Sequence, residues 1–131
     1  NYLISAALTL IMAQRLARKT CLDCRVIDEN ITPKLLNSIG FLPEQSARAK
    51  IHKGSGCEAC GGSGYKGRMG LYEILEIDNE LKAGVLSNLQ QTELNAIAKK
   101  NGFRTMQDMG RDLLLSGDLS FAEYERVLQS N

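Results

Sequence analysis

The 131-residue sequence contains no tryptophan, and aromatic residues make up only 5% of it. A hydrophobic core built from this chain must therefore be mainly aliphatic. Neither sign of charge dominates, because 16 Lys and Arg face 15 Asp and Glu, for a formal net charge of +1. A net charge this small gives no general reason to expect a nucleic-acid or membrane partner. Hydrophobic residues at 44% argue against disorder of the whole chain and fit one ordinary domain, or a small domain plus part of another.

Motifs that carry catalysis are also missing. The sequence has no G-x-x-x-x-G-K-[ST] phosphate loop, no nucleophile elbow and no Ser/His/Asp set. Residues 62–67 match G-x-G-x-x-G, but a dinucleotide fingerprint follows a strand and opens a helix, whereas this match follows a cysteine pair and precedes a predicted strand. We expect these glycines only to allow positive φ angles in a turn. The sequence predicts no catalytic residue, no cofactor-binding loop and no enzymatic activity for this chain.

No apolar run is long enough to cross a membrane. The longest run covers residues 3–13, whereas a spanning helix needs about 20 apolar residues. The run predicts a helix over residues 2–13 that is apolar nearly all round and therefore buried. We interpret this helix as part of a larger body upstream. Residues 14–20 predict either a short strand or a continuation of the helix.

The rest of the chain predicts short elements and then a helical tail. Thr32 as N-cap, Pro33 in the first turn and Gly40 after the end predict a helix over residues 33–40. Residues 49–52 are expected to be extended. Residues 67–77 predict a strand whose two faces are both largely apolar, so we expect both faces to be covered. Four helices are expected in the tail, over residues 78–87, 92–100, 105–117 and from Ser120 onward, the last with a Ser120–Glu123 capping box.

The sequence does contain four cysteines. They form two C-x₂-C pairs, Cys21 with Cys24 and Cys57 with Cys60. Two-residue spacing lets both sulfurs of a pair face one tetrahedral metal, and two pairs complete an S₄ shell that suits Zn²⁺ at about 2.3 Å per bond. Basic residues near both pairs can offset the thiolate charge: Arg18, Lys19, Arg25, Lys53 and Lys66. The sequence favours a closed, structural zinc site.

Other interpretations of the cysteines are disulfides, a redox-active dithiol or inert buried thiols. Disulfide frameworks are typical of small secreted chains, and nothing in this sequence signals secretion. The single histidine, His52, could replace one ligand, although single histidines are usually ordinary surface or packing residues. The charge distribution suggests two modules, because residues 1–68 hold ten basic against five acidic residues and residues 69–131 hold six against ten.

Both cysteine pairs sit in a sequence that resembles one protein family. Residues 13–24, A-Q-R-L-A-R-K-T-C-L-D-C, resemble the segment that enters the tetracysteine module of the type IV pilus assembly and type II secretion ATPases. Residues 57–60 and 64–73 resemble the exit from that module, and residues 102–123 are similar to the family's C-terminal helices. The resemblance covers essentially the whole chain, in order.

The resemblance implies an α+β, mostly helical fold. Residues 1–20 would be the last helix and strand of a RecA-like ATPase core, residues 21–64 an inserted tetracysteine zinc module, and residues 65–131 the returning strand and a C-terminal helical bundle. It implies structural Zn²⁺ on Cys21, Cys24, Cys57 and Cys60. ATP and Mg²⁺ would bind only the full-length parent, a cytoplasmic homo-hexameric motor that lies peripherally at the inner membrane. The zinc module would dock an inner-membrane platform protein or a neighbouring subunit, and no nucleic acid is expected.

Two other functions remain open at this stage. Residues 57–64 fit the C-x-x-C-x-G-x-G repeat of DnaJ-like chaperone zinc domains, but that family uses four such repeats and residues 21–28 lack both glycines. A zinc-ribbon nucleic-acid binder is the second, with a basic cluster to contact phosphates: Arg15, Arg18, Lys19 and Arg25. Base-stacking aromatic residues are missing beside that cluster.

Overall fold

The computed structural model describes residues 2–129. The chain folds as two compact units, each built from two segments. The first unit contains the residues up to 14 together with residues 72–105, and the second contains residues 15–71 together with the residues from 106 onward. Helices and strands both contribute, as expected for the α+β class. None of the helices in the described residues is both long and apolar enough to span a bilayer.

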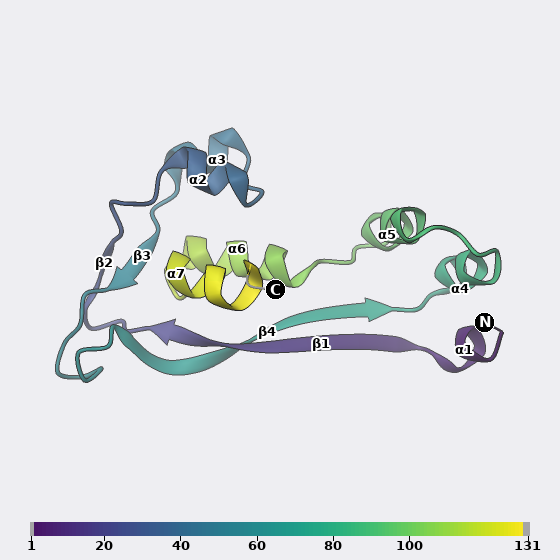
Figure 1. Ribbon diagram of the computed structural model, residues 1–131, viewed down its shortest axis with the longest axis horizontal. Helices are drawn as coiled ribbons and strands as arrows, with labels where there is room; N and C mark the ends of the chain where they lie inside the picture. Colours follow the sequence, from purple (N-terminus) through teal and green to yellow (C-terminus); the bar gives the residue numbers. More distant parts are fainter. Residues whose placement is uncertain (1, 130–131) are drawn as a thin grey trace. The chain divides into compact units, whose positions relative to one another are not determined.

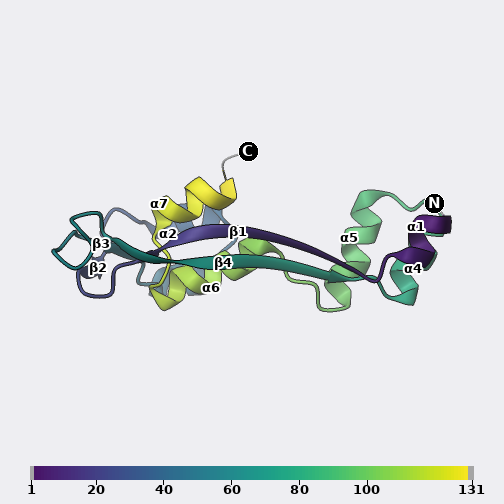
Figure 2. The same cartoon turned by 90° about the horizontal axis from the view of Figure 1, so that it is seen from below.

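Two long strands, β1 (Leu10–Thr20) and β4 (Tyr65–Glu76), form a two-stranded sheet and run in opposite directions (Figures 1 and 2). The strand interpretation of residues 14–20 is therefore confirmed, whereas the helix predicted over residues 2–13 is wrong beyond α1 (Tyr2–Ala7). A short continuous apolar run fits a helix and a strand equally well, so periodicity alone does not separate them. The predicted burial is wrong too, because the side chains of Leu3 and Ile11 are 80% and 46% exposed.

The first unit places α1 beside α4 (Asn79–Leu86), which in turn lies beside α5 (Gln91–Lys100) (Figure 1). As predicted, α4 begins at an N-cap, because the Asp78 carboxylate accepts a hydrogen bond from the backbone N–H of Leu81 at 2.8 Å. The outer face of β4 is not covered as expected: Tyr72 and Ile74 are 41% and 50% exposed.

The second unit contains the predicted helix α2 (Pro33–Ser38), capped by Thr32, and two elements that were not predicted, β2 (Arg25–Ile27) and α3 (Pro43–Arg48). Strand β2 pairs antiparallel with β3 (His52–Gly54), with Arg25 opposite Gly54. The extended segment expected over residues 49–52 overlaps β3 only at its last residue. Both strands have three residues, so their sequences carry almost no alternation from which to predict them.

The C-terminal helices of the second unit are α6 (Met106–Ser116) and α7 (Phe121–Tyr124), which continues into one π-helical turn, η1 (Glu125–Gln129). Their apolar side chains are buried as predicted and join one core with residues from α2, the segment before β3 and the long strands. That core contains Ala17, Leu36, Ile39, Phe41, Ile51, Leu71, Met106, Leu114, Leu119, Phe121, Tyr124, Val127 and Leu128. The core is mainly aliphatic and includes Ala17 of β1, which leads into the first cysteine pair, and Leu71 of β4, which follows the second.

Candidate metal centre

The sulfurs of the four cysteines lie together in the second unit, all within 4.8 Å of one another. Three Sγ–Sγ distances are 3.8 Å for Cys21 and Cys57, 3.9 Å for Cys24 and Cys60, and 3.7 Å for Cys57 and Cys60. These separations are far beyond a disulfide bond of about 2.05 Å, and all four cysteines are free. Tetrahedral S₄ coordination with bonds of about 2.3 Å places sulfurs about 3.8 Å apart. The arrangement fits one tetrahedral metal ion.

Each cysteine pair occupies a loop that follows or precedes a strand. Cys21 comes directly after β1, and Cys24 comes directly before β2. The second pair lies in the loop between β3 and β4. Backbone hydrogen bonds fasten the two loops to each other: the Cys21 N–H donates to the Gly64 carbonyl at 2.9 Å, and the Ser55 N–H donates to the Cys24 carbonyl at 3.0 Å. The backbone thus holds the four sulfurs close without any covalent link.

Backbone N–H groups point at two of the sulfurs. Gly56 N–H donates to Cys24 Sγ, and the N–H groups of Cys57 and Gly64 both donate to Cys60 Sγ, each at 3.2 Å. Such hydrogen bonds favour the thiolate over the thiol. The N–H of Cys57, followed by that of Gly64, lowers the pKa of Cys60 to about 6, although partial burial opposes this.

Cys57 shows the opposite behaviour. A hydrogen bond with the Cys60 backbone lowers the pKa of Cys57. Desolvation and hydrogen bonds with the thiols of Cys60, Cys21 and Cys24 outweigh this effect and raise the pKa of Cys57 to about 11. Crowded sulfurs cannot all carry a negative charge without a cation between them. A divalent metal would supply that cation and displace the remaining protons.

Glycines let the two cysteine loops approach closely. Gly64 has φ +82°, and a Cβ atom there would lie 2.6 Å from the Gly54 carbonyl oxygen. Gly56 has φ +95°, and its Cβ would lie 2.8 Å from the Gly62 carbonyl oxygen. Both the positive φ angles and the backbone contacts require glycine. Gly62, Gly64 and Gly67 all have positive φ, which confirms the role expected for the glycines of residues 62–67.

His52 does not join the sulfur group. Among the described residues, the group that can hold a metal consists of the four cysteines alone. The imidazole of His52 lies elsewhere in the second unit, where its Nδ1 would be 3.0 Å from a Cβ atom at Gly117. The sequence leaves His52 open as a replacement ligand, but its position gives that alternative no support.

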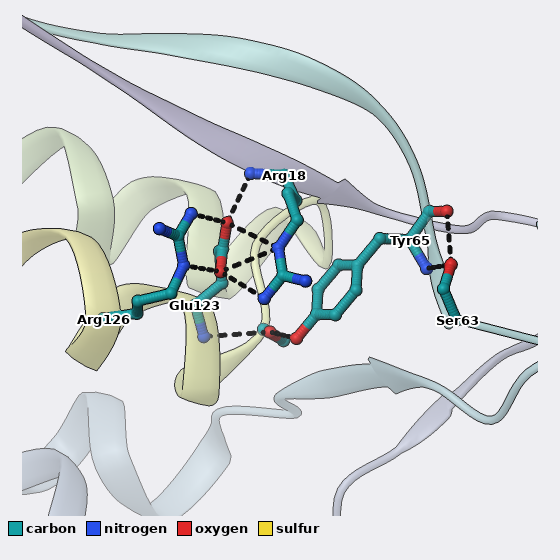
Figure 3. Close-up of polar contacts among 6 residues, drawn as sticks. Arg18, Ser63, Tyr65, Glu123 and Arg126 are labelled. Carbon is teal, nitrogen blue, oxygen red and sulfur yellow. Dashed lines mark hydrogen bonds and ion pairs between the residues drawn. The ribbon is translucent and has the colours of Figure 1, made fainter.

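The sequence predicts Glu123 only as part of a capping box, but the structure buries its carboxylate between two arginines. Glu123 is 0% exposed, and its carboxylate accepts hydrogen bonds from the backbone N–H and guanidinium of Arg18 and from Nε and Nη2 of Arg126, the latter two at 2.7 Å (Figure 3). Burial by itself raises the pKa of Glu123, but the hydrogen bonds from Arg126 and Arg18 outweigh it and lower the pKa to about 2. Glu123 is therefore a buried carboxylate that stays charged.

The predicted capping box is half right. Ser120 Oγ accepts a hydrogen bond from the Glu123 N–H at 3.2 Å, but the Glu123 side chain turns to the arginines instead of the N-cap backbone. Tyr65, the first residue of β4, completes the cluster: the Arg18 guanidinium lies 4.1 Å from the centre of its ring. No local signal identifies these contacts, because Arg18 and Glu123 are 105 residues apart in the sequence.

The sequence of the chain is similar to those of known proteins. The sequence profile of the type II/IV secretion system proteins matches residues 1–126. The chain belongs to the type II/IV secretion system protein family. It is 36% identical over 120 residues to the type IV pilus assembly ATPase PilB of Thermus thermophilus. The matched region covers 92% of this chain and 13% of that protein.

Other family members give a similar result. The chain is 35% identical over 131 residues to the type IV pilus assembly ATPase TfpB of Acinetobacter baylyi, covering 97% of this chain and 22% of that protein. It is 31% identical over 127 residues to a putative type II secretion system protein E of Escherichia coli, covering 97% of this chain and 25% of that protein. The chain thus spans a quarter or less of the length of these secretion system relatives.

Proposed function

We propose that this chain is the non-catalytic, zinc-binding C-terminal segment of a hexameric motor ATPase that powers type IV pilus assembly or type II secretion. The observation that carries the proposal is the group of four cysteine sulfurs within 4.8 Å of one another, in a chain of the type II/IV secretion system family. Relatives named type IV pilus assembly ATPase and type II secretion system protein E support the motor assignment. They also favour it over the chaperone and nucleic-acid interpretations.

Zinc would be held by Cys21, Cys24, Cys57 and Cys60 and would act as a structural cross-link. Four sulfur ligands with tetrahedral spacing leave no coordination position for a substrate, which is the arrangement of structural zinc sites. The N–H groups that face Cys24 and Cys60 would stabilise the bound thiolates. Residues 21–64 would form the metal module between the two long strands.

ATP and Mg²⁺ would bind to other parts of the parent protein, and residues 1–20 would complete its RecA-like core. Residues 65–131 would return from the module and pack as the C-terminal helices. The module would dock an inner-membrane platform protein or a neighbouring subunit of a homo-hexamer on the cytoplasmic side of the membrane. No nucleic-acid partner is proposed.

The test is a Cys57→Ser substitution in the full-length parent. We expect loss of about one zinc ion per chain, measured by metal analysis of the purified protein, and loss of pilus assembly or secretion in cells. The matched control is Glu58→Gln, because Glu58 is exposed between the two cysteines of the same pair. Retention of both zinc and assembly or secretion in the cysteine variant would contradict the proposal.

A further inference from the structure

A cavity of about 490 Å³ opens in the second unit, and three arginines line it. Arg18 comes from β1, Arg68 from β4 and Arg126 from η1. Tyr65 and Leu16 add apolar surface to the wall. None of the four cysteines lines the cavity, so it is separate from the metal centre.

The lining of this cavity carries positive charge. Among the described residues that line it none is acidic, and two of its arginines, Arg18 and Arg126, bind the buried carboxylate of Glu123. Arg68 is exposed, and its side chain makes no hydrogen bond or ion pair with residues 2–129. Three guanidinium groups and no acidic side chain in the lining give the cavity a positively charged wall.

Two of the arginines are held in place before any ligand arrives. The Arg18 guanidinium is fixed by Glu123 at 3.0 Å and by the Tyr65 ring at 4.1 Å (Figure 3). Arg126 is fixed by two hydrogen bonds to the same carboxylate. Yet the side chains of Arg18 and Arg126 remain 48% and 54% exposed. Ordering these groups in advance lowers the entropic cost of binding an anion.

We propose that this cavity, which we name the three-arginine cavity, binds carboxylate side chains of an acidic segment in a partner protein. Planar guanidinium groups recognise carboxylates through paired hydrogen bonds. Phosphate sites commonly include backbone N–H groups at a helix N-terminus. In this cavity the positive charge comes from side chains alone, which favours a carboxylate over a phosphate. The apolar wall, where Leu16 is 53% exposed, fits an apolar residue next to the acidic one. The site depends neither on the metal nor on the motor activity.

The test is a titration of the zinc-loaded 131-residue chain with the peptide acetyl-Leu-Asp-Glu-Leu-Asp-Glu, followed by NMR of the arginine Nε–H groups. We expect the signals of Arg18 and Arg68 to shift, and the affinity to fall as salt is added. The Arg68→Gln variant should bind at least about tenfold more weakly, because it loses a charge-assisted pair. Arg68 is chosen because its side chain is exposed and makes no hydrogen bond or ion pair with residues 2–129, whereas replacing Arg18 would remove a partner of the buried Glu123 carboxylate.

The matched control is Arg48→Gln, which removes another exposed arginine of the same unit, outside the cavity, and should leave the affinity unchanged. A peptide with Asn and Gln in place of Asp and Glu should not bind. Four outcomes would each overturn the proposal. The Arg68→Gln chain could bind the acidic peptide as tightly as the wild type, or the amide peptide could bind as tightly as the acidic one. The acidic peptide could fail to bind, or inorganic pyrophosphate could bind more tightly than the peptide. Zinc content measured on the same samples separates this result from that for the metal centre.

Discussion

The hydroxyl group of Tyr65 lies 3.1 Å from Oγ of Ser120, so the first residue of β4 contacts the N-cap of α7. Tyr65 directly follows Gly64, whose N–H donates to Cys60 Sγ. Two neighbouring residues therefore contact the candidate metal centre on one side and the C-terminal helix on the other. A substitution at Tyr65, close in sequence to the cysteines, should therefore change the stability of the contact with α7.

Replacing Tyr65 with phenylalanine removes the hydroxyl contact and keeps the ring beneath Arg18. We expect the free energy of unfolding of the zinc-loaded chain to fall by about 1 kcal/mol, the usual net value of one hydrogen bond. Urea unfolding followed by circular dichroism measures this change. Tyr2→Phe is the control, because Tyr2 is 73% exposed; the same loss in both variants would contradict the assigned contact.

Glu123→Gln should lower the free energy of unfolding at pH 7 by about 3 kcal/mol, the equivalent of a pKa held near 2 against a usual value of 4.5. Because the folded-state pKa is depressed, this contribution is complete above about pH 4.5 and is lost as the pH falls toward 2. The difference between wild type and variant should therefore shrink from pH 7 to pH 3.5 in thermal unfolding curves. Acid release of zinc acts on both chains alike, so a difference that stayed constant over this range would contradict the assignment.

Gly64→Ala and Gly62→Ala form a matched pair near the cysteines. Both glycines have φ +82°, but a Cβ atom at Gly64 would meet the Gly54 carbonyl at 2.6 Å, whereas one at Gly62 would meet nothing within 4 Å. We expect Gly64→Ala to weaken zinc binding at least tenfold in competition with a chelator, because the N–H···S bond to Cys60 would move. Gly62→Ala should show only the cost of the left-handed backbone, about 1 kcal/mol in stability. Equal zinc affinities would exclude the steric explanation.

Gly110→Ala tests the packing of α6 on the last helix. The added Cβ would lie 2.5 Å from Leu128 Cδ1 and 2.8 Å from Tyr124 Cε2. Alanine favours a helix, yet we expect a net loss of about 1–3 kcal/mol because the core is overpacked. Gln107→Ala, at an exposed position of the same helix, should instead be neutral or slightly stabilising. A higher melting temperature for Gly110→Ala would show that the two helices can separate without cost.

The sequence was most informative where one residue type has one structural use. The two C-x₂-C pairs indicated sulfurs that the structure does bring together, and Thr32 and Asp78 marked helix starts correctly. Whether the cysteines bind zinc stays a prediction. Local patterns failed where they were ambiguous, as in residues 2–13, or where the interaction is long-range. Glu123 is the clearest case. Its backbone N–H does bond to Ser120 as the capping box predicts, but its carboxylate binds Arg18 instead of the N-cap backbone.

The hydrophobic core includes Leu36, Ile39 and Phe41 from the segment between the cysteine pairs, together with Leu114 and other residues of the C-terminal helices. That segment is therefore fastened twice, once at its ends by the cysteines and once in its middle by apolar contacts. Between the two attachments lies the turn at residues 28–30, where Glu29 and Asn30 are exposed. Closing a longer loop costs only about 0.6 kcal/mol per doubling of its length. Insertions in related chains should therefore accumulate at this turn, while the lengths of both cysteine loops stay fixed.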